Sequence, residues 1–354
     1  MQKKYSTTYQ NRFGLIISGH RNDELFSLTN TKINRDNAAY PYFLIKKILN
    51  QSNVEIHTSD YIAAQKEDPS FIIYNDYRPN EISPPKSARK YILALETPEI
   101  HKNNSANSLA TSDVDIIFTW RTDIESKNIK KIFFPNKIIL ENVTPARDRT
   151  SFACLIAGNK SSASHQTNDL YSERLKTIRW FESNHLNLFS LYGIGWDKPA
   201  MPRNAILKKA FKLYGKIPGI LKKRPFKSYR GTIESKQAVL NNYKFCICYE
   251  NYRNHNSYIT EKIFDCFFAG CIPIYWGAPD IQDHIPEDCF IDRRKFQSHE
   301  QLFEHMCSLN DTQLEKYQAN IRSFLLSDKA VPFSAEYFAT TITNQILKDI
   351  GRLD

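Results

Sequence analysis

Short apolar runs alternate with amphipathic stretches along most of the chain. Runs such as 71–74 and 91–95 have the length and composition of buried strands, and residues 39–49 carry apolar side chains at helical spacing. This alternation is typical of a parallel, doubly wound α/β sheet. The expected strands are 13–17, 54–57, 71–74, 91–95, 115–118, 132–134, 152–157, 188–192, 245–249 and 272–276. The expected helices are 39–49, 170–181, 237–242, 263–269, 300–308, 312–325 and 334–348.

The pattern runs through two successive series, with a break near residue 145. We therefore expect two Rossmann-like α/β domains, residues 1–145 and 146–354, that face a cleft. The last helix is expected either to stay with the second domain or to pack back on the first. At 354 residues, 41% of them apolar, the chain has ample material for two cores.

Composition narrows the class of protein and its compartment. No apolar run approaches the ~20 residues of a membrane-spanning helix, and the polar start, 1–12, lacks the apolar segment of a signal peptide. The seven cysteines lie mostly in apolar runs and include no C-x-x-C pair. They indicate buried thiols rather than disulfides or a zinc site. We expect a cytoplasmic protein.

The chain has a net charge of +10, and the positive excess lies in one segment, 198–233. No acidic residue occurs between Asp197 and Glu234. Apolar side chains are interleaved with its lysines and arginines. Such a segment fits the inner face of an anionic membrane or a phosphorylated glycolipid, and it equally fits a solvated basic loop. A nucleic-acid partner is disfavoured, since no motif of a nucleic-acid-binding fold accompanies the charge.

The stretch 243–292 concentrates polar side chains between two apolar strands. The run 245–249 ends on Glu250 and Asn251, a polar loop follows, and Thr260 is placed to cap a helix that starts at Glu261 and Lys262. Parallel sheets bind ligands at the carboxyl ends of their strands, and helix N-termini favour anions. A nucleoside diphosphate fits this place.

These residues also resemble a known family. The Glu250-Asn251 pair, the string 258–263 (YITEKI) and the string 273–277 (PIYWG) are similar to the signature of α-1,3/α-1,4-fucosyltransferases, with Tyr249 where the family usually carries Phe. The resemblance implies two Rossmann-like domains of the GT-B type, with the acceptor on the first and the nucleotide sugar on the second. It also implies transfer of L-fucose from GDP-fucose with inversion and without an obligatory metal.

A carboxylate is needed to take the proton of the attacking hydroxyl. Glu96 is the candidate, because it ends the apolar run 91–95 and so faces the ligand edge of the sheet. Glu96-Thr97-Pro98 is similar to the Glu-Ser-Pro of the family, whose glutamate is the proposed base. The alternative for Glu96 is an ordinary surface residue at a strand end.

Two cations are expected to stabilise the departing diphosphate. Lys262 in the first helical turn opposes the helix dipole, so it indicates a bound anion. Arg174, early in the helix 170–181, could clamp a phosphate bidentately, with Arg179 as the competing choice. A metal is not expected: Asp113-Val114-Asp115 precedes a strand, at the edge away from the ligand.

The other expected contacts with the nucleotide sugar come from polar residues near Lys262 in the sequence. Glu261 suits the ribose hydroxyls or the helix dipole. Asn251 and Tyr258 correspond to donor-binding positions of the family, and Glu250 suits either sugar hydroxyls or a structural role.

The sequence therefore predicts an inverting fucosyltransferase that uses GDP-fucose and a glycan or glycolipid acceptor, with α-1,3 or α-1,4 linkage. By resemblance to bacterial members, its product would belong to surface polysaccharide or lipopolysaccharide. The alternatives are a transferase of the same fold with another nucleotide-activated deoxysugar, or a non-catalytic protein that binds membranes or polyanions.

Overall fold

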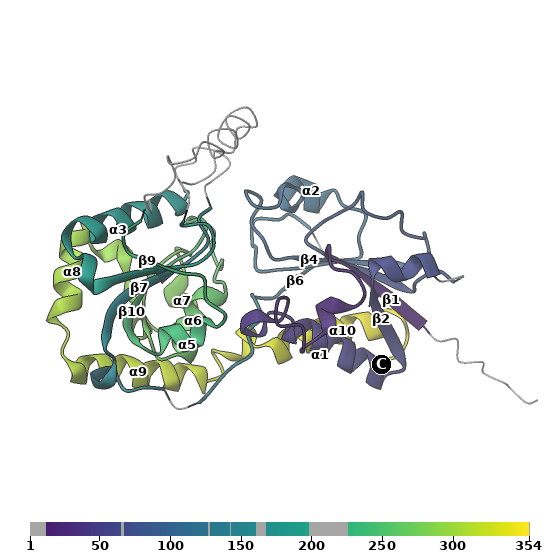
Figure 1. Cartoon of the computed structure of the whole chain (residues 1–354). Coiled ribbons are helices and arrows are strands. Elements are labelled where there is room, and N and C mark those ends of the chain that lie inside the picture. The colour runs from purple at the N-terminus through teal and green to yellow at the C-terminus, as the bar shows by residue number, and fades with distance from the viewer. Residues whose placement is uncertain are drawn as a thin grey trace, which may run out of the picture. The chain divides into compact units, whose positions relative to one another are not determined.

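The chain folds into two compact units, Met1–Lys137 with Pro332–Asp354, and Ile138–Val331. The computed structural model describes residues 12–64, 67–126, 128–141, 143–160, 168–197 and 226–353 (Figure 1). Each unit is built on a six-stranded sheet whose paired strands all run parallel. The predicted fold class, α/β with two doubly wound sheets, is confirmed.

The N-terminal unit has the strand order β2-β1-β3-β4-β5-β6. The order reverses between β1 and β3, which makes the carboxyl ends of these strands the expected place for a ligand. The strands are β1 (Arg12–Ile17), β2 (Val54–Thr58), β3 (Phe71–Asn75), β4 (Arg89–Ala94), β5 (Ile116–Thr119) and β6 (Ile129–Lys131).

Helices cover both faces of this first sheet. The helices α1 (Tyr40–Gln51) and α10 (Ala335–Asp349) pack side by side on one face, where their apolar side chains share a core with the sheet. The short α2 (Ala106–Ala110) lies over the other face (Figure 1), and its Leu109 joins the core there. The helix α10, near the C-terminus, thus belongs to the N-terminal unit.

The C-terminal unit has the strand order β12-β11-β10-β7-β8-β9. Counted within the unit, this is the strand order of a dinucleotide-binding fold, with its reversal between β7 and β10. The strands are β7 (Ser151–Ile156), β8 (Phe189–Tyr192), β9 (Tyr229–Gly231), β10 (Tyr243–Tyr249), β11 (Ile272–Trp276) and β12 (Ile291–Asp292). The helices are α3 (Tyr171–Asn184), α5 (Lys236–Leu240), α6 (Glu261–Phe268), α7 (Ile281–His284), α8 (His299–Ser308) and α9 (Asp311–Leu325).

The strand alternation assigns the two faces of this sheet to different helices. Leu155 and Ile247 point into a core with α3 and α8, whereas Cys246 and Cys248 face α5 and α6. Of the seven cysteines, six are buried and none forms a disulfide. The predicted buried thiols are confirmed.

One predicted strand is wrong. Residues 132–134 lie in extended chain just after β6, and the strand itself is Ile129–Lys131, paired with Ile117–Thr119. Ile132 and Phe133 are buried. The Ile132 amide still donates to the Thr119 carbonyl at 3.0 Å, so the pairing ends where the predicted strand begins. The sequence also missed the short elements α2, α7, β9 and β12.

None of the helices among the described residues combines the length and apolar character needed to span a bilayer. Most of the basic segment 198–233, namely residues 198–225, lies outside the described residues.

Candidate functional site

Two carboxyl-edge clusters contain the residues that the sequence selected. Six of them (Arg174, Glu250, Asn251, Tyr258, Glu261 and Lys262) lie in the C-terminal unit, around the end of β10 and the start of α6. Glu96 lies in the N-terminal unit, just after β4.

The start of α6 is fixed by a cap and a buried carboxylate. The Thr260 hydroxyl accepts a hydrogen bond from the Lys262 amide, 3.4 Å away, which confirms the predicted N-cap. Glu250 is fully buried, and its carboxylate accepts hydrogen bonds from the Thr260 amide (2.9 Å) and hydroxyl (2.8 Å). The carboxylate therefore ties the end of β10 to the first turn of α6.

Lys262 is held by the same carboxylate. Its Nζ donates to Glu250 Oε2 at 3.1 Å and to the Thr260 hydroxyl at 3.0 Å, and it lies 3.9 Å from Glu261 Oε1. Burial lowers the pKa of Lys262, but the charges of Glu250 and Glu261 outweigh burial and raise it overall. The ammonium is thus charged and oriented before any ligand arrives.

Glu261 lies between two lysines on the exposed side of this turn. Its Oε1 is 3.8 Å from Lys236 Nζ as well as 3.9 Å from Lys262 Nζ. Burial raises the pKa of Glu261, yet the two lysine charges together lower it to about 2. Its side chain keeps 46% of its exposure, so a charged carboxylate remains accessible for hydroxyl groups.

Arg174 reaches the same edge from α3. Its Nη2 donates to the backbone carbonyls of Tyr249 (2.6 Å) and Glu250 (2.7 Å) and to the Asn251 amide oxygen (3.0 Å). The residue is 5% exposed, and burial lowers the pKa of its guanidinium. An arginine stays charged in proteins even so. Arg174 therefore brings a fixed positive charge to the end of β10.

Asn251 connects this arginine to a tyrosine. While its oxygen accepts from Arg174, its Nδ2 donates to the Tyr258 hydroxyl, 3.4 Å away. Tyr258 is 1% exposed. Arg174, Asn251 and Tyr258 therefore form a hydrogen-bonded network that is largely buried.

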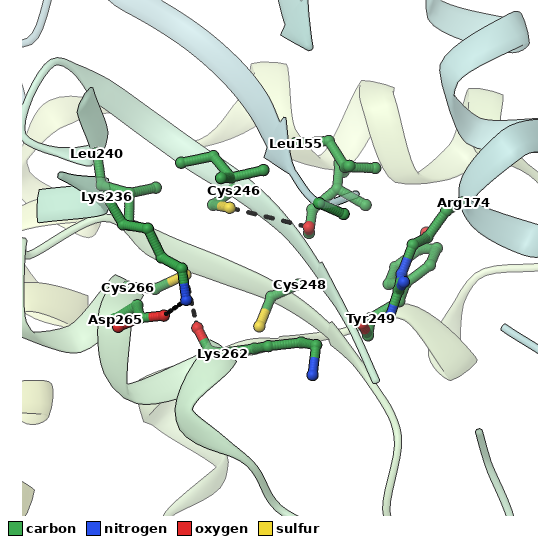
Figure 2. Close-up of a pocket in the computed structure, with 13 residues that line it drawn as sticks. Leu155, Arg174, Lys236, Leu240, Cys246, Cys248, Tyr249, Lys262, Asp265 and Cys266 are labelled. Carbon is green, nitrogen blue, oxygen red and sulfur yellow. Dashed lines mark hydrogen bonds and ion pairs between the residues drawn. The ribbon is translucent and has the colours of Figure 1, made fainter. Parts of the chain in front are cut away.

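Arg174 and Lys262 line one small cavity, shown in Figure 2. In this view Arg174 lies beside Tyr249, and the Lys236 ammonium lies against Asp265, 2.6 Å away. The cavity has about 30 Å³ of space, enough for one or two waters and far less than a nucleotide needs. A nucleotide at this edge would therefore lie against the mouth of the cavity.

The backbone of Glu96 is clamped from both sides. Its amide donates to Asp76 Oδ1 at 3.0 Å, and its carbonyl accepts from Asn104 Nδ2 at 2.9 Å. Asn104 also donates to Asp76 Oδ1 at 2.8 Å and is fully buried. This arrangement fixes the position of Glu96 at the carboxyl end of β4.

Other groups that the sequence considered lie elsewhere. Arg179 forms an ion pair with Glu182 at 2.8 Å on the outer side of α3. Asp113 and Asp115 precede β5, where they pair with Lys90 (2.5 Å) and Arg89 (2.6 Å). Among the described residues, no group of three or more potential ligands could hold a metal ion.

Sequence reasoning missed the supporting residues of both clusters. Asp76 follows β3 as Glu96 follows β4, so its position at a strand end was a usable signal. The other supporting residues act through contacts between segments far apart in the sequence, which no local pattern encodes. They are Asn104, Lys236 and Thr260 in its role as a hydrogen-bond donor to Glu250.

Residues 212–326 match the family model described as glycosyltransferase family 10 (fucosyltransferase) C-term. This part of the chain is similar to glycosyltransferase family 10. The predicted resemblance to fucosyltransferases is therefore confirmed for the region that contains β10 and α6.

Two curated relatives resemble the chain over short stretches. An α-(1,3)-fucosyltransferase of Helicobacter pylori is 32% identical over 74 residues, which are 21% of this chain and 15% of the relative. An α-(1,4)-fucosyltransferase of Arabidopsis thaliana is 39% identical over 74 residues, 21% of this chain and 18% of the relative. The chain thus matches less than a fifth of the length of either protein.

The similarity in fold extends beyond these stretches. A crystal structure of an α1,3-fucosyltransferase with GDP superimposes with a TM-score of 0.53 at 14% identity, over 100% of this chain and 96% of the other. Anabaena HepE in complex with UDP-glucose gives 0.52 at 11% identity, over 96% and 100%. At such identities the likeness shows the fold alone.

Proposed function

We propose that the protein is an inverting glycosyltransferase that transfers L-fucose from GDP-fucose to a hydroxyl group of a glycan. The observation that carries the proposal is the pair of cations at the end of β10. Lys262 lies inside the region 212–326 that matches the family 10 model, and Arg174 reaches the same edge from α3. A cation at a helix N-terminus and a buried guanidinium are suited to a diphosphate. The GDP-bound structural relative supports the choice of nucleotide.

In the proposed reaction the acceptor oxygen forms a bond to the anomeric carbon as the bond from that carbon to the phosphate oxygen breaks. GDP leaves with the bonding electron pair, and the extra negative charge falls on its terminal phosphate. Lys262 and Arg174 stabilise this charge, which develops in the transition state. Glu250 contributes indirectly, because it holds the ammonium of Lys262 in place.

The proton of the acceptor hydroxyl goes to Glu96. Its clamped backbone, bonded to Asp76 and Asn104, keeps the residue at a fixed place on the ligand edge of its sheet. A positioned general base contributes about 10²–10⁴-fold to the rate. In this scheme the N-terminal unit binds the acceptor and the C-terminal unit binds the nucleotide sugar.

The remaining donor contacts use other polar groups of the same cluster. Glu261, ionised by its two lysine neighbours, accepts hydrogen bonds from the ribose hydroxyls. Asn251 and Tyr258 contact the sugar or the phosphates, and Glu250 contacts sugar hydroxyls only if the donor displaces part of its present network. Two protein cations supply the positive charge, so a metal is not required for this scheme.

The acceptor is a glycan or glycolipid, modified in α-1,3 or α-1,4 linkage, and bacterial surface polysaccharide or lipopolysaccharide is the class we propose. The H. pylori relative supports this assignment. A cytoplasmic location belongs to the proposal, with free thiols as its support. Membrane contact through 198–233 is a further part of it.

Nucleotide-dependent thermal stability separates this function from its alternatives. We expect GDP at about a hundredfold over its dissociation constant to stabilise the protein by about 2.7 kcal/mol, and dTDP to have no effect. Turnover is then measured with GDP-fucose, with EDTA added in a parallel reaction. Stabilisation by dTDP alone would indicate another donor, and no response to either nucleotide would favour a non-catalytic protein.

A further inference from the structure

A second polar groove lies in the C-terminal unit, at the carboxyl ends of β11 and β12. It has about 720 Å³ of space, and its lining includes Trp276, Arg253, Arg293 and Arg294 but neither Arg174 nor Lys262. One acidic residue, Glu173, also lines it, and this carboxylate pairs with Lys176 at 2.8 Å. The groove is therefore rich in positive charge.

Arg293 has no counter-charge of its own. The residue is only 7% exposed, and its Nη1 donates to the Phe296 carbonyl at 2.6 Å. Its Nε is buried without a hydrogen-bond partner, and Arg293 forms no ion pair with any other described residue. A buried guanidinium without a carboxylate is costly, so a bound anion is the expected compensation.

The groups next to Arg293 determine the charge and shape of this wall. Arg294 differs from Arg293, because its guanidinium pairs with Asp292 at 2.7 Å. Burial and then the charge of Arg293 lower the pKa of the nearby His299 to about 4, so that imidazole is neutral. The Arg253 and Arg293 guanidinium carbons lie 5.1 and 5.6 Å from the centre of the Trp276 ring. Two oriented arginines and an aromatic ring thus share one wall.

The groove shares a wall with the proposed donor cluster. Gly277 lines the groove. A Cβ atom at this position would lie 2.5 Å from Glu250 Cγ, so only glycine fits beside Glu250 here. Glu250 in turn holds Lys262. A ligand in the groove would therefore lie beside the donor without using the donor's two cations.

We infer that this groove binds an oxyanion carried by a sugar, either the carboxylate of an acidic sugar or a sugar phosphate. The arginines would bind the oxyanion through charge-assisted hydrogen bonds, and Trp276 would pack against the sugar ring. The inference rests on the proposed function in one respect: the anionic sugar is a part of the glycan acceptor distinct from the one whose attacking hydroxyl the N-terminal unit binds. The protein would then prefer acidic acceptors to neutral ones.

Calorimetric titration of the full chain tests the anion site directly. The probes are glucuronate, galactose 6-phosphate, inorganic phosphate and, as the neutral control, galactose. Each is titrated with GDP at saturation, which occupies the proposed diphosphate site, and again without GDP. We expect glucuronate or galactose 6-phosphate to bind about tenfold or more tightly than galactose. The tighter of the two identifies the source of the oxyanion, and inorganic phosphate shows what the sugar adds.

The variant Arg293→Gln should weaken binding of the preferred anionic sugar by about tenfold or more and leave GDP affinity within about twofold. Arg253→Gln provides an independent variant of the same wall, in case Arg293→Gln does not fold. The matched control is Arg147→Gln, which removes an exposed arginine paired with Glu315 elsewhere in the unit.

Three results would overturn the inference: no saturable binding of either anionic sugar, binding that neither groove variant weakens, or loss of GDP affinity in Arg293→Gln, which would place Arg293 in the donor site. Failure of the proposed function gives a different result, because the titrations without GDP need neither GDP binding nor turnover.

Discussion

Glu96 and Lys262, at the carboxyl edges of the two sheets, carry opposite charges and are held by different means. After β4, Glu96 is fixed through its backbone, which Asp76 and Asn104 bind from both sides. After β10, Lys262 is fixed through its side chain, which Glu250 binds directly. A backbone clamp fixes where a residue lies, whereas a side-chain ion pair keeps a cation charged and aimed.

This difference suggests that the first edge serves the chemical step and the second edge serves nucleotide binding. Variants at the first edge should change the rate of the chemical step with little effect on nucleotide binding, and variants at the second edge should change nucleotide binding. Each prediction below tests one side of that division.

The largest effect is expected for Glu96→Gln. The amide keeps the size of the side chain but cannot accept the proton, so kcat should fall about a hundredfold or more while the GDP dissociation constant stays within about twofold. Initial-rate kinetics with GDP-fucose measure the first quantity. The control is Glu81→Gln, which removes an exposed carboxylate paired with Arg78 in the same unit. Unchanged turnover in Glu96→Gln would exclude Glu96 as the base.

Lys262→Gln should weaken GDP binding by about 10- to 100-fold, because a hydrogen bond to a charged group contributes about 1.5–3 kcal/mol. The GDP-induced rise in Tm reports the loss. Lys244→Gln is the matched control: this lysine lies on β10 and pairs with Asp311 at 2.9 Å away from the cluster. An equal loss in both variants would point to general electrostatics instead of a specific contact.

Asn104→Ala should lower kcat by about tenfold, because it releases the carbonyl of Glu96 and leaves buried groups unpaired. The same change should lower the free energy of unfolding by about 1–3 kcal/mol. GDP-induced stabilisation should persist, since the proposed nucleotide site is in the other unit. Asn103→Ala, which removes an exposed neighbour bonded to the Tyr77 carbonyl, serves as control. If both variants lowered kcat equally, the clamp would have no special role.

The smallest effect concerns Glu261 and pH. Its pKa in the folded protein, about 2, lies below its ordinary value of 4.5, so its ionised form stabilises the folded state above pH 4.5. That contribution is lost as the pH falls from 4.5 through about 2. We expect Glu261→Gln to have a Tm lower by about 2 °C or less at neutral pH, because the side chain is partly exposed. The gap should close in acid. A gap that widens with acidity would contradict the assignment.

Much of this arrangement could be predicted from local sequence. The strand 272–276, the Thr260 cap and the buried cysteines all follow from patterns within a few residues. The strand predicted at 132–134 failed because the buried apolar residues Ile132 and Phe133 follow the paired strand, whose own residues 129–131 include two lysines.

The groups that hold the clusters could not be predicted in this way. Asn104 meets Asp76 across 28 positions, and Arg174 meets the end of β10 across 75. Such contacts depend on strand order, which periodicity does not encode. The uncompensated charge of Arg293 was equally invisible, because its sequence neighbour Arg294 has the same chemistry and a partner.

The central claim is that Lys262 holds the diphosphate of the donor, and one comparison tests it most directly. GDP and guanosine are each titrated calorimetrically into the wild-type protein and into Lys262→Gln. The account predicts that the variant loses about tenfold or more in affinity for GDP and keeps its affinity for guanosine. An unchanged dissociation constant for GDP, or an equal loss for both ligands, would contradict it.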